Sequence, residues 1–154
     1  MRALSLCQSH TLDEMSRVAV VGATGAVGKE ILRCLDVRKF PLKELRLLAS
    51  SRSAGSTVSF QGKDHTVGLL DEDAFEDIDV AFFSAGGGLS KQFAPAVTKA
   101  GATMIDNSSA FRMTEGVPLI VPEVNPEALN EVRILPQRTH QVSECNPVDF
   151  FLWF

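Results

Sequence analysis

The 154-residue chain has no tyrosine, one tryptophan and only three cysteines. Without tyrosine, it cannot use the Tyr-x-x-x-Lys pair of short-chain reductases and epimerases. Cys7, Cys34 and Cys145 are widely spaced and odd in number, which argues against a disulfide framework. They also lack the spacing of a metal site, so we expect no bound metal and a reducing, cytoplasmic compartment.

Excess positive charge and long apolar runs are also missing. The net charge is -4, so neither nucleic acid nor an anionic membrane is an expected partner. No apolar run is long enough to span a bilayer, and the N-terminal residues are too polar for a signal peptide. We expect residues 1–15 to be a disordered lead-in, with Met15 as the natural start. The length and the 45% hydrophobic content predict one packed domain.

Short apolar runs alternate with helical patterns along the chain. The expected strands are Arg17–Val21, Leu45–Ala49, Asp79–Phe83, Thr103–Ile105 and Leu119–Val121. A hairpin is expected from Thr57–Phe60 and Thr66–Leu70, turning at Gln61–Asp64. Strands that alternate with helices predict an α/β fold with a mostly parallel sheet, whose ligands bind at the carboxyl ends of the strands.

Two helices are expected between these strands. Ala26–Val37 carries an apolar stripe of Val27, Ile31, Leu32 and Leu35. The second helix, Leu89–Ala100, has a stripe of Phe93, Ala96, Val97 and Ala100, with Gly101 as its C-terminal cap. Pro95 is expected to kink or delay it. Asn125-Pro126 is typical of the start of a further helix.

Glycines at three-residue intervals separate the first strand from the first helix. Gly22 permits a tight turn, Gly25 lets the backbone approach a pyrophosphate, and Gly28 allows close packing of helix on strand. The helix N-terminus then offers N–H groups to phosphates. An ordinary strand-to-helix turn is the alternative, but the context favours a dinucleotide site in a Rossmann-type, doubly wound fold.

The loop after the second strand indicates which dinucleotide. It reads Ser50-Ser51-Arg52-Ser53, where an NAD enzyme would carry an acidic residue for the ribose hydroxyl. A guanidinium among hydroxyls suits a 2′-phosphate through charge-assisted hydrogen bonds. The alternative is a solvated loop with one arginine, and we favour NADP as the cofactor.

Several longer motifs occur in order between Val18 and about Leu129. They read VAVVGATGAVG, LLASSRSAG, FFSAGGGLS, IDNSSAFR and VPLIVPEVNPEAL. This stretch resembles the N-terminal part of the aspartate-β-semialdehyde dehydrogenases. The resemblance implies an NADP-dependent oxidoreductase that interconverts aspartyl phosphate and aspartate semialdehyde, on the route to lysine, methionine and threonine. It also implies covalent catalysis by a cysteine thiolate and acid–base chemistry by a histidine.

The resemblance assigns roles at the matching positions. The phosphates and ribose of the cofactor would contact Thr24, Gly25, Ala26 and Val27, within the turn from Gly22 to Gly28. The 2′-phosphate would be read by Ser50, Arg52 and Ser53, and the nicotinamide half would lie beside Ser84, Ala85 and Gly86. Asn107 would border the active site, and Arg112 would hold inorganic phosphate or the acyl phosphate. Arg112 also follows a hydroxyl-rich strand end, although a surface arginine is the alternative there.

The resemblance stops near Leu129, before the family's P-N-C-[ST] nucleophile motif, which does not occur in this chain. Cys145 follows Glu144, which would raise a thiol pKa if it lies close, and its pairing with His140 is best explained by chance. We therefore assign no catalytic residue and expect no turnover. Residues 16–130 are the predicted NADP-binding domain and 131–154 a divergent tail, as in a truncated or frame-shifted product.

The family's second domain, which carries most of its dimer interface, has no counterpart in the sequence. Two other interpretations stay open. One is a stand-alone nucleotide-binding or regulatory module. The other is a fragment of a related acetylglutamyl-phosphate reductase, although the SRS loop and the IDNSSAFR stretch favour the aspartate enzyme.

Overall fold

The computed structural model describes residues 16–121, 124, 125, 128 and 139–142. The predictions for residues 1–15, Pro126, Cys145 and the end of the chain lie outside these residues. The strands are β1 (Ser16–Val21), β2 (Leu42–Ala49), β3 (Thr57–Phe60), β4 (Lys63–Thr66), β5 (Gly68–Leu69), β6 (Val80–Phe83), β7 (Thr103–Asp106), β8 (Leu119–Ile120) and β9 (Thr139–Val142). The helices are α1 (Ala26–Val37), the 3-10 turn η1 (Asp73–Phe75) and α2 (Gly87–Lys99).

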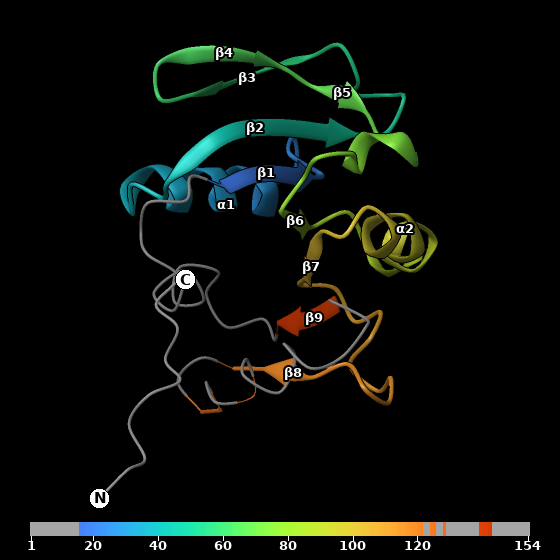
Figure 1. The fold of residues 1–154 in the computed structure, drawn as a ribbon. Coiled ribbons are helices and arrows are strands. Elements are labelled where there is room, and N and C mark those ends of the chain that lie inside the picture. The colour runs from blue at the N-terminus through green and yellow to red at the C-terminus, as the bar shows by residue number, and fades with distance from the viewer. Residues whose placement is uncertain (1–15, 122–123, 126–127, 129–138, 143–154) are drawn as a thin grey trace, which may run out of the picture.

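Seven of the strands form one sheet in the order β5-β2-β1-β6-β7-β9-β8, and the pairings within it are parallel. Figure 1 shows this sheet running from β2 to β8, with the separate β3–β4 hairpin beyond β2. The chain goes from β1 outward to β2, and then returns to place β6 on the other side of β1. The predicted Rossmann-type, doubly wound α/β fold is therefore confirmed.

Both faces of the sheet are buried, each against its own helix. Val18 and Val20 of β1 pack in a cluster with Ile31 and Leu35 of α1. The alternate residues of the same strand, Ala19 and Val21, pack in a second cluster that contains Phe93 and Val97 of α2. Because successive side chains of a strand point to opposite faces, a continuous apolar run is what a strand between two helical layers needs.

Helix α1 begins and ends at the predicted residues, but its first turn differs from the predicted apolar stripe. Val27 is 41% exposed, whereas Gly28 and Cys34 are buried with Ile31, Leu32 and Leu35. The stripe prediction was wrong at Val27 because this residue has the spacing of the stripe but lies outside the core cluster that buries the rest of it. Its neighbours one turn further along reach the core.

Helix α2 begins at Gly87, two residues before the predicted start, and continues past Pro95 to Lys99. Pro95 therefore does not delay the helix. Ala100 is exposed, so it does not belong to the predicted stripe. Gly101 adopts φ +79° and the amide of Ala102 donates to the carbonyl of Val97 at 3.2 Å, which confirms the glycine cap.

The hairpin has a shorter turn than predicted. β3 and β4 pair through the two-residue turn Gln61–Gly62, and both of its residues have positive φ. The predicted second arm divides in two, because β4 ends at Thr66 and β5 joins the main sheet beside β2. The amide of Leu70 donates to the carbonyl of Ala49, which holds β5 there.

Strand β9 lies between β7 and β8, parallel to both. Its residues follow residue 130, where the end of the NADP-binding domain is predicted. That domain boundary stays a prediction. The side-chain oxygen of Asn125 accepts a hydrogen bond from the amide of Val121 at 2.7 Å, and the side-chain nitrogen of Asn125 donates to the carbonyl of Leu119 at 2.9 Å. These bonds hold the chain just after β8.

The tight contact between α1 and the glycine turn predicts a large cost for Gly28→Ala. An added Cβ would collide with the carbonyl oxygen of Gly22 and lie 2.8 Å from the Cα of Ala23. Since both are backbone atoms, we expect a loss of about 1–3 kcal/mol in the free energy of unfolding, measured by urea denaturation with circular dichroism. The control is Gly88→Ala in α2, where a Cβ meets nothing within 4 Å and helix propensity favours alanine. Equal stability of the two variants would contradict this account.

Cys34 is the described free cysteine, and it is 1% exposed within the α1 core cluster. Burial raises the pKa of its thiol, and the nearby Glu30 carboxylate adds to the effect. We therefore expect slow alkylation of Cys34 by iodoacetamide at neutral pH, with fast alkylation once urea unfolds the chain. Peptide mass spectrometry measures both rates, and similar rates in the two states would show that Cys34 is accessible.

Candidate functional site

The predicted site residues lie on loops that leave the carboxyl ends of neighbouring strands. These loops follow β2, β1, β6 and β7, which are adjacent in the sheet. The register pairs Val21 with Leu48 and with Phe83, and Phe83 with Asp106. All four strands therefore end at one edge, and the order reverses at β1, where doubly wound sheets bind their ligands.

The glycine turn brings α1 against the end of β1. Gly22 has φ +84°, and a Cβ there would lie 2.8 Å from the carbonyl oxygen of Ser84. The amide of Gly25 donates to the carbonyl of Gly22 at 3.0 Å, which closes the turn. Thr24 is half-buried, whereas Gly25, Ala26 and Val27 are exposed at this edge.

The N-terminus of α1 has the features of an anion site. No side chain caps it, and its first turn contains no acidic residue. Uncapped amides and the positive end of the helix dipole both favour a negatively charged group. Gly25 is exposed and has no Cβ, so such a group can approach the backbone closely there.

The loop after β2 folds on itself directly beside this turn. The carbonyl of Leu48 accepts the amide of Gly22 at 2.8 Å, which joins the two strand ends. The amides of Ser53 and Ala54 both donate to the carbonyl of Ser50 at 2.9 Å. Ser50 and Arg52 are exposed and Ser53 is half-buried. The Arg52 guanidinium pairs with none of the carboxylates that the structure describes.

The loop after β6 leads into α2. The amide of Ser84 and its hydroxyl both bond to the carbonyl of Val21, at 3.0 and 3.1 Å, so this loop is tied to β1. Ala85 is half-buried, and Gly86 is exposed with φ +88° at the start of α2. No side chain caps this helix either.

The loop after β7 carries the last two predicted residues. The amide of Asn107 donates to the carbonyl of Phe83 at 3.2 Å, so Asn107 lies beside the Ser84 loop. Arg112 is half-buried and follows Phe111, which packs against the α2 core cluster. Every predicted site residue therefore belongs to one of the loops at this edge or to the first turn of α1.

A buried polar network at the same edge was missed by the sequence analysis. Ser90 in α2 and Asp106 at the end of β7 are both 0% exposed, and the Ser90 hydroxyl donates to the Asp106 carboxylate at 2.8 Å. A carboxylate that ends an apolar strand was the available signal. Its partner in α2 could not be foreseen, because Ser90 is 16 residues away along the chain.

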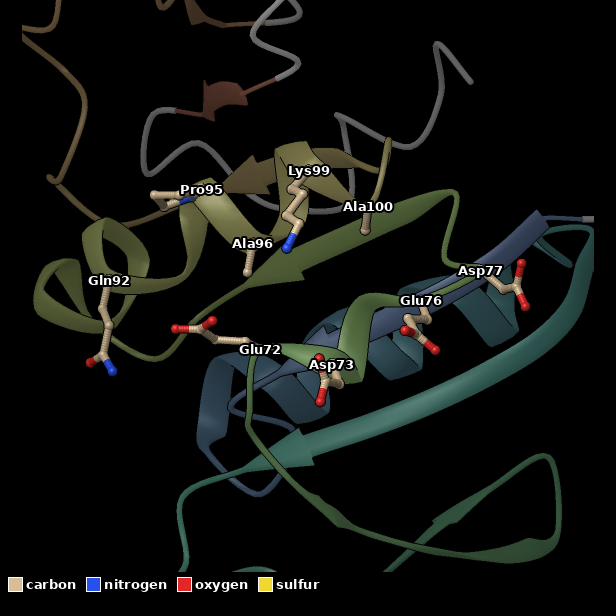
Figure 2. A pocket seen from close by; sticks show the side chains of 9 residues that line it. All are labelled: Glu72, Asp73, Glu76, Asp77, Gln92, Pro95, Ala96, Lys99 and Ala100. Carbon is tan, nitrogen blue, oxygen red and sulfur yellow. The ribbon is translucent and has the colours of Figure 1, made fainter.

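A separate groove lies between η1 and α2, away from these loops (Figure 2). The carboxylates of Glu72, Asp73, Glu76 and Asp77 line it, with Lys99 facing them. So many acidic groups would repel phosphates, so this groove is not the nucleotide site. Within the described part of the chain, no group of three or more His, Cys, Asp or Glu could hold a metal ion, and no helix has the length and apolarity needed to cross a membrane.

Comparison with known proteins identifies the family of the chain. The family described as semialdehyde dehydrogenase, NAD binding domain, matches residues 17–132. The aspartate-semialdehyde dehydrogenase of Synechocystis sp. is 59% identical over 112 residues, which are 73% of this chain and 33% of that protein. The chain thus spans about a third of the length of such relatives.

Solved structures give the same result. Aspartate semialdehyde dehydrogenase II of Vibrio cholerae, complexed with ASA, superposes with a TM-score of 0.77 at 42% identity, covering 90% of this chain and 45% of that one. The Candida albicans enzyme, solved with NADP, has a TM-score of 0.70 at 27% identity, covering 85% and 43%. The family match, the shared fold and the strand-edge loops agree, and the chain belongs to the semialdehyde dehydrogenase family, of which it carries the NAD binding domain.

Proposed function

We propose that this chain binds NADP(H) as the cofactor-binding part of an aspartate-semialdehyde dehydrogenase. The observation that carries the proposal is the close approach of Gly28 to Gly22, which sets an uncapped helix N-terminus beside an arginine-containing loop. Proteins named aspartate-semialdehyde dehydrogenase are similar to this chain over about three quarters of its length, and one of the similar structures was solved with NADP.

The residues at this edge fit the two phosphate groups of the cofactor differently. The amides at Ala26 and Val27 suit the pyrophosphate, with Thr24 and Gly25 beside them, because both residues are exposed and no acid competes for them. Arg52 suits the 2′-phosphate, with the hydroxyls of Ser50 and Ser53 nearby in the same turn. This division explains a preference for NADP over NAD.

The loops after β6 and β7 suit the nicotinamide and the phosphate group of the substrate. Ser84, Ala85 and Gly86 would border the nicotinamide, and Asn107 and Arg112 would hold the phosphate of an acyl phosphate or inorganic phosphate. When bound, NADPH supplies hydride for reduction of aspartyl phosphate to aspartate semialdehyde, a step toward lysine, methionine and threonine. The loops of this chain would hold both partners at one sheet edge, as proximity requires.

Catalysis itself needs groups that this sequence does not supply. It has no P-N-C-[ST] motif, and the buried Cys34, with its raised pKa, is unsuited to be a nucleophile. We therefore propose cofactor binding without turnover for this chain alone. Dimerisation through a further domain, as the resemblance implies, and a reducing cytoplasm that keeps Cys34 a thiol belong to the same proposal.

A stand-alone nucleotide-binding module is the second candidate, and the absent nucleophile motif is what favours it. Both candidates require the same cofactor site. They differ in whether the loop after β7 holds a phosphate, because only the dehydrogenase needs that group beside the nicotinamide. Phosphate binding that depends on Arg112 would favour the dehydrogenase.

Arg52→Ala is expected to weaken NADPH binding about 10- to 100-fold, because it removes charge-assisted hydrogen bonds to the 2′-phosphate. NADH has no such phosphate, and its affinity is expected to stay the same. Titration of each variant with both cofactors, followed by NADPH fluorescence or calorimetry, measures the two constants. A wild-type chain with equal affinity for NADPH and NADH would defeat the assignment.

The matched control is Arg33→Ala. Arg33 is also an exposed arginine, but its guanidinium pairs with Glu30 on the outer surface of α1. Exposed pairs of this kind contribute little to stability, so this variant is expected to bind both cofactors as the wild type does. An equal loss in both arginine variants would indicate a general effect of net charge instead of a contact.

The chain alone is expected not to form NADPH from NADP, aspartate semialdehyde and inorganic phosphate. The reason is the missing nucleophile motif, and the measurement is the absorbance of NADPH over time. The same sample must bind NADPH in a fluorescence titration, so that a negative result reflects chemistry and not misfolding. Sustained NADPH formation would overturn the proposal that the chain lacks turnover.

A further inference from the structure

The carboxylate of Asp106 is buried between two of the ligand-edge loops. It is 0% exposed, and hydroxyl and amide groups of two described residues, Ser90 and Ser108, donate to it. The hydroxyl of Ser90 donates to Oδ1 at 2.8 Å, the hydroxyl of Ser108 donates to Oδ2 at 2.6 Å, and the amide of Ser108 donates to Oδ1 at 3.2 Å. Ser90 belongs to the first turns of α2, and Ser108 to the loop after β7.

Bonds at either side extend this network into both loops. The Ser90 hydroxyl also lies 3.3 Å from the carbonyl oxygen of Gly86, in the loop after β6. On the other side, the amide of Ala110 donates to the Ser108 hydroxyl at 3.1 Å. Asp106 thus connects Gly86, at the start of α2, to the backbone that leads to Arg112.

A packing contact brings the same two loops together independently. A Cβ built on Gly87 would lie 3.6 Å from the Cα and the Cβ of Ala110, which is ordinary van der Waals contact. The backbones of the α2 start and of the loop after β7 therefore pack closely. A shift of either loop would disturb both this contact and the carboxylate bonds.

The energetics argue for a role beyond stability. Burying a carboxylate costs desolvation free energy that hydrogen bonds only offset, so an apolar side chain of similar volume would often be as stable. The carboxylate instead contributes a defined geometry, because its two oxygens fix the positions of donors on two separate segments. A buried polar network of this kind rigidifies whatever it connects.

We propose that Asp106 is a positioning residue that couples the cofactor loop to the phosphate loop. The proposal rests on the function proposed above for these loops. When NADPH orders the Ser84–Gly86 segment and the start of α2, the Asp106 network orders the loop that carries Asn107 and Arg112. A phosphate group then binds to a loop that is already ordered, so each ligand strengthens the binding of the other.

A substitution in α2 can remove one hydrogen bond of the network without altering any residue proposed to touch a ligand. Ser90→Ala removes the donor that ties α2 to Asp106. The matched control is Thr98→Ala in the same helix, because the Thr98 hydroxyl donates to the carbonyl of Ala94, one turn earlier, and lies outside the network. Ser108→Ala is the second variant, and it opens the network from the other loop. Circular dichroism first establishes that each variant is folded.

The measurement is the ratio of the NADPH dissociation constants without and with inorganic phosphate. We expect the wild type and Thr98→Ala to share a ratio of about fivefold or more, and Ser90→Ala and Ser108→Ala to fall close to one. Competition of phosphate for the Arg52 loop would change all four ratios alike, so the comparison between variants isolates the network. By reciprocity, NADPH must change the phosphate dissociation constant by the same factor.

Two failures are distinguishable. If the wild-type chain does not bind NADPH, the proposed function fails, and this inference fails with it. If NADPH binds but all four chains share one ratio, cofactor binding stands and the coupling through Asp106 is refuted.

Discussion

The contact between the backbone of Gly28 and the carbonyl of Gly22 is the constraint on which the ligand edge depends. It lets α1 begin almost against the end of β1, at a separation that any Cβ would prevent. Gly22 is fixed in turn by its amide bond to Leu48, and it faces the Ser84 carbonyl with no side chain between them. The loops after β2 and β6 are thereby held on either side of one helix N-terminus.

Charge is separated across the molecule although the net charge is -4. The loops 22–25, 50–56, 84–86 and 107–112 contain no acidic residue, while Arg52 and Arg112 belong to them. The four carboxylates of Glu72, Asp73, Glu76 and Asp77 gather instead along the groove beside η1 and α2 (Figure 2). An acidic protein can therefore favour an anion locally, because interactions between exposed charges are screened over about 10 Å at moderate ionic strength.

Much of this arrangement could be predicted from the sequence, because parallel strands buried on both faces appear as apolar runs with ligand loops after them. The bounds of α1 and the position of every site loop follow from that pattern. The exposure of Val27 could not, since helical spacing does not show which side chains of the first turn the tertiary fold covers. The division of the second hairpin arm was missed because the sequence pattern does not show where β4 stops pairing with β3 and β5 joins β2. The Ser90–Asp106 bond was missed because it joins segments that only the tertiary fold brings together.

Strand β9 has a consequence for the order in which the sheet assembles. Among the described strands, β8 has β9 as its neighbour in the sheet, and β9 lies between β8 and β7. Residues 119–120 must therefore wait until residues 139–142 leave the ribosome before they can take their place. The pairings that join β1, β2, β5, β6 and β7 to one another use only sequence that precedes β8, so the nucleotide-binding edge can be built during synthesis while β8 is still unpaired.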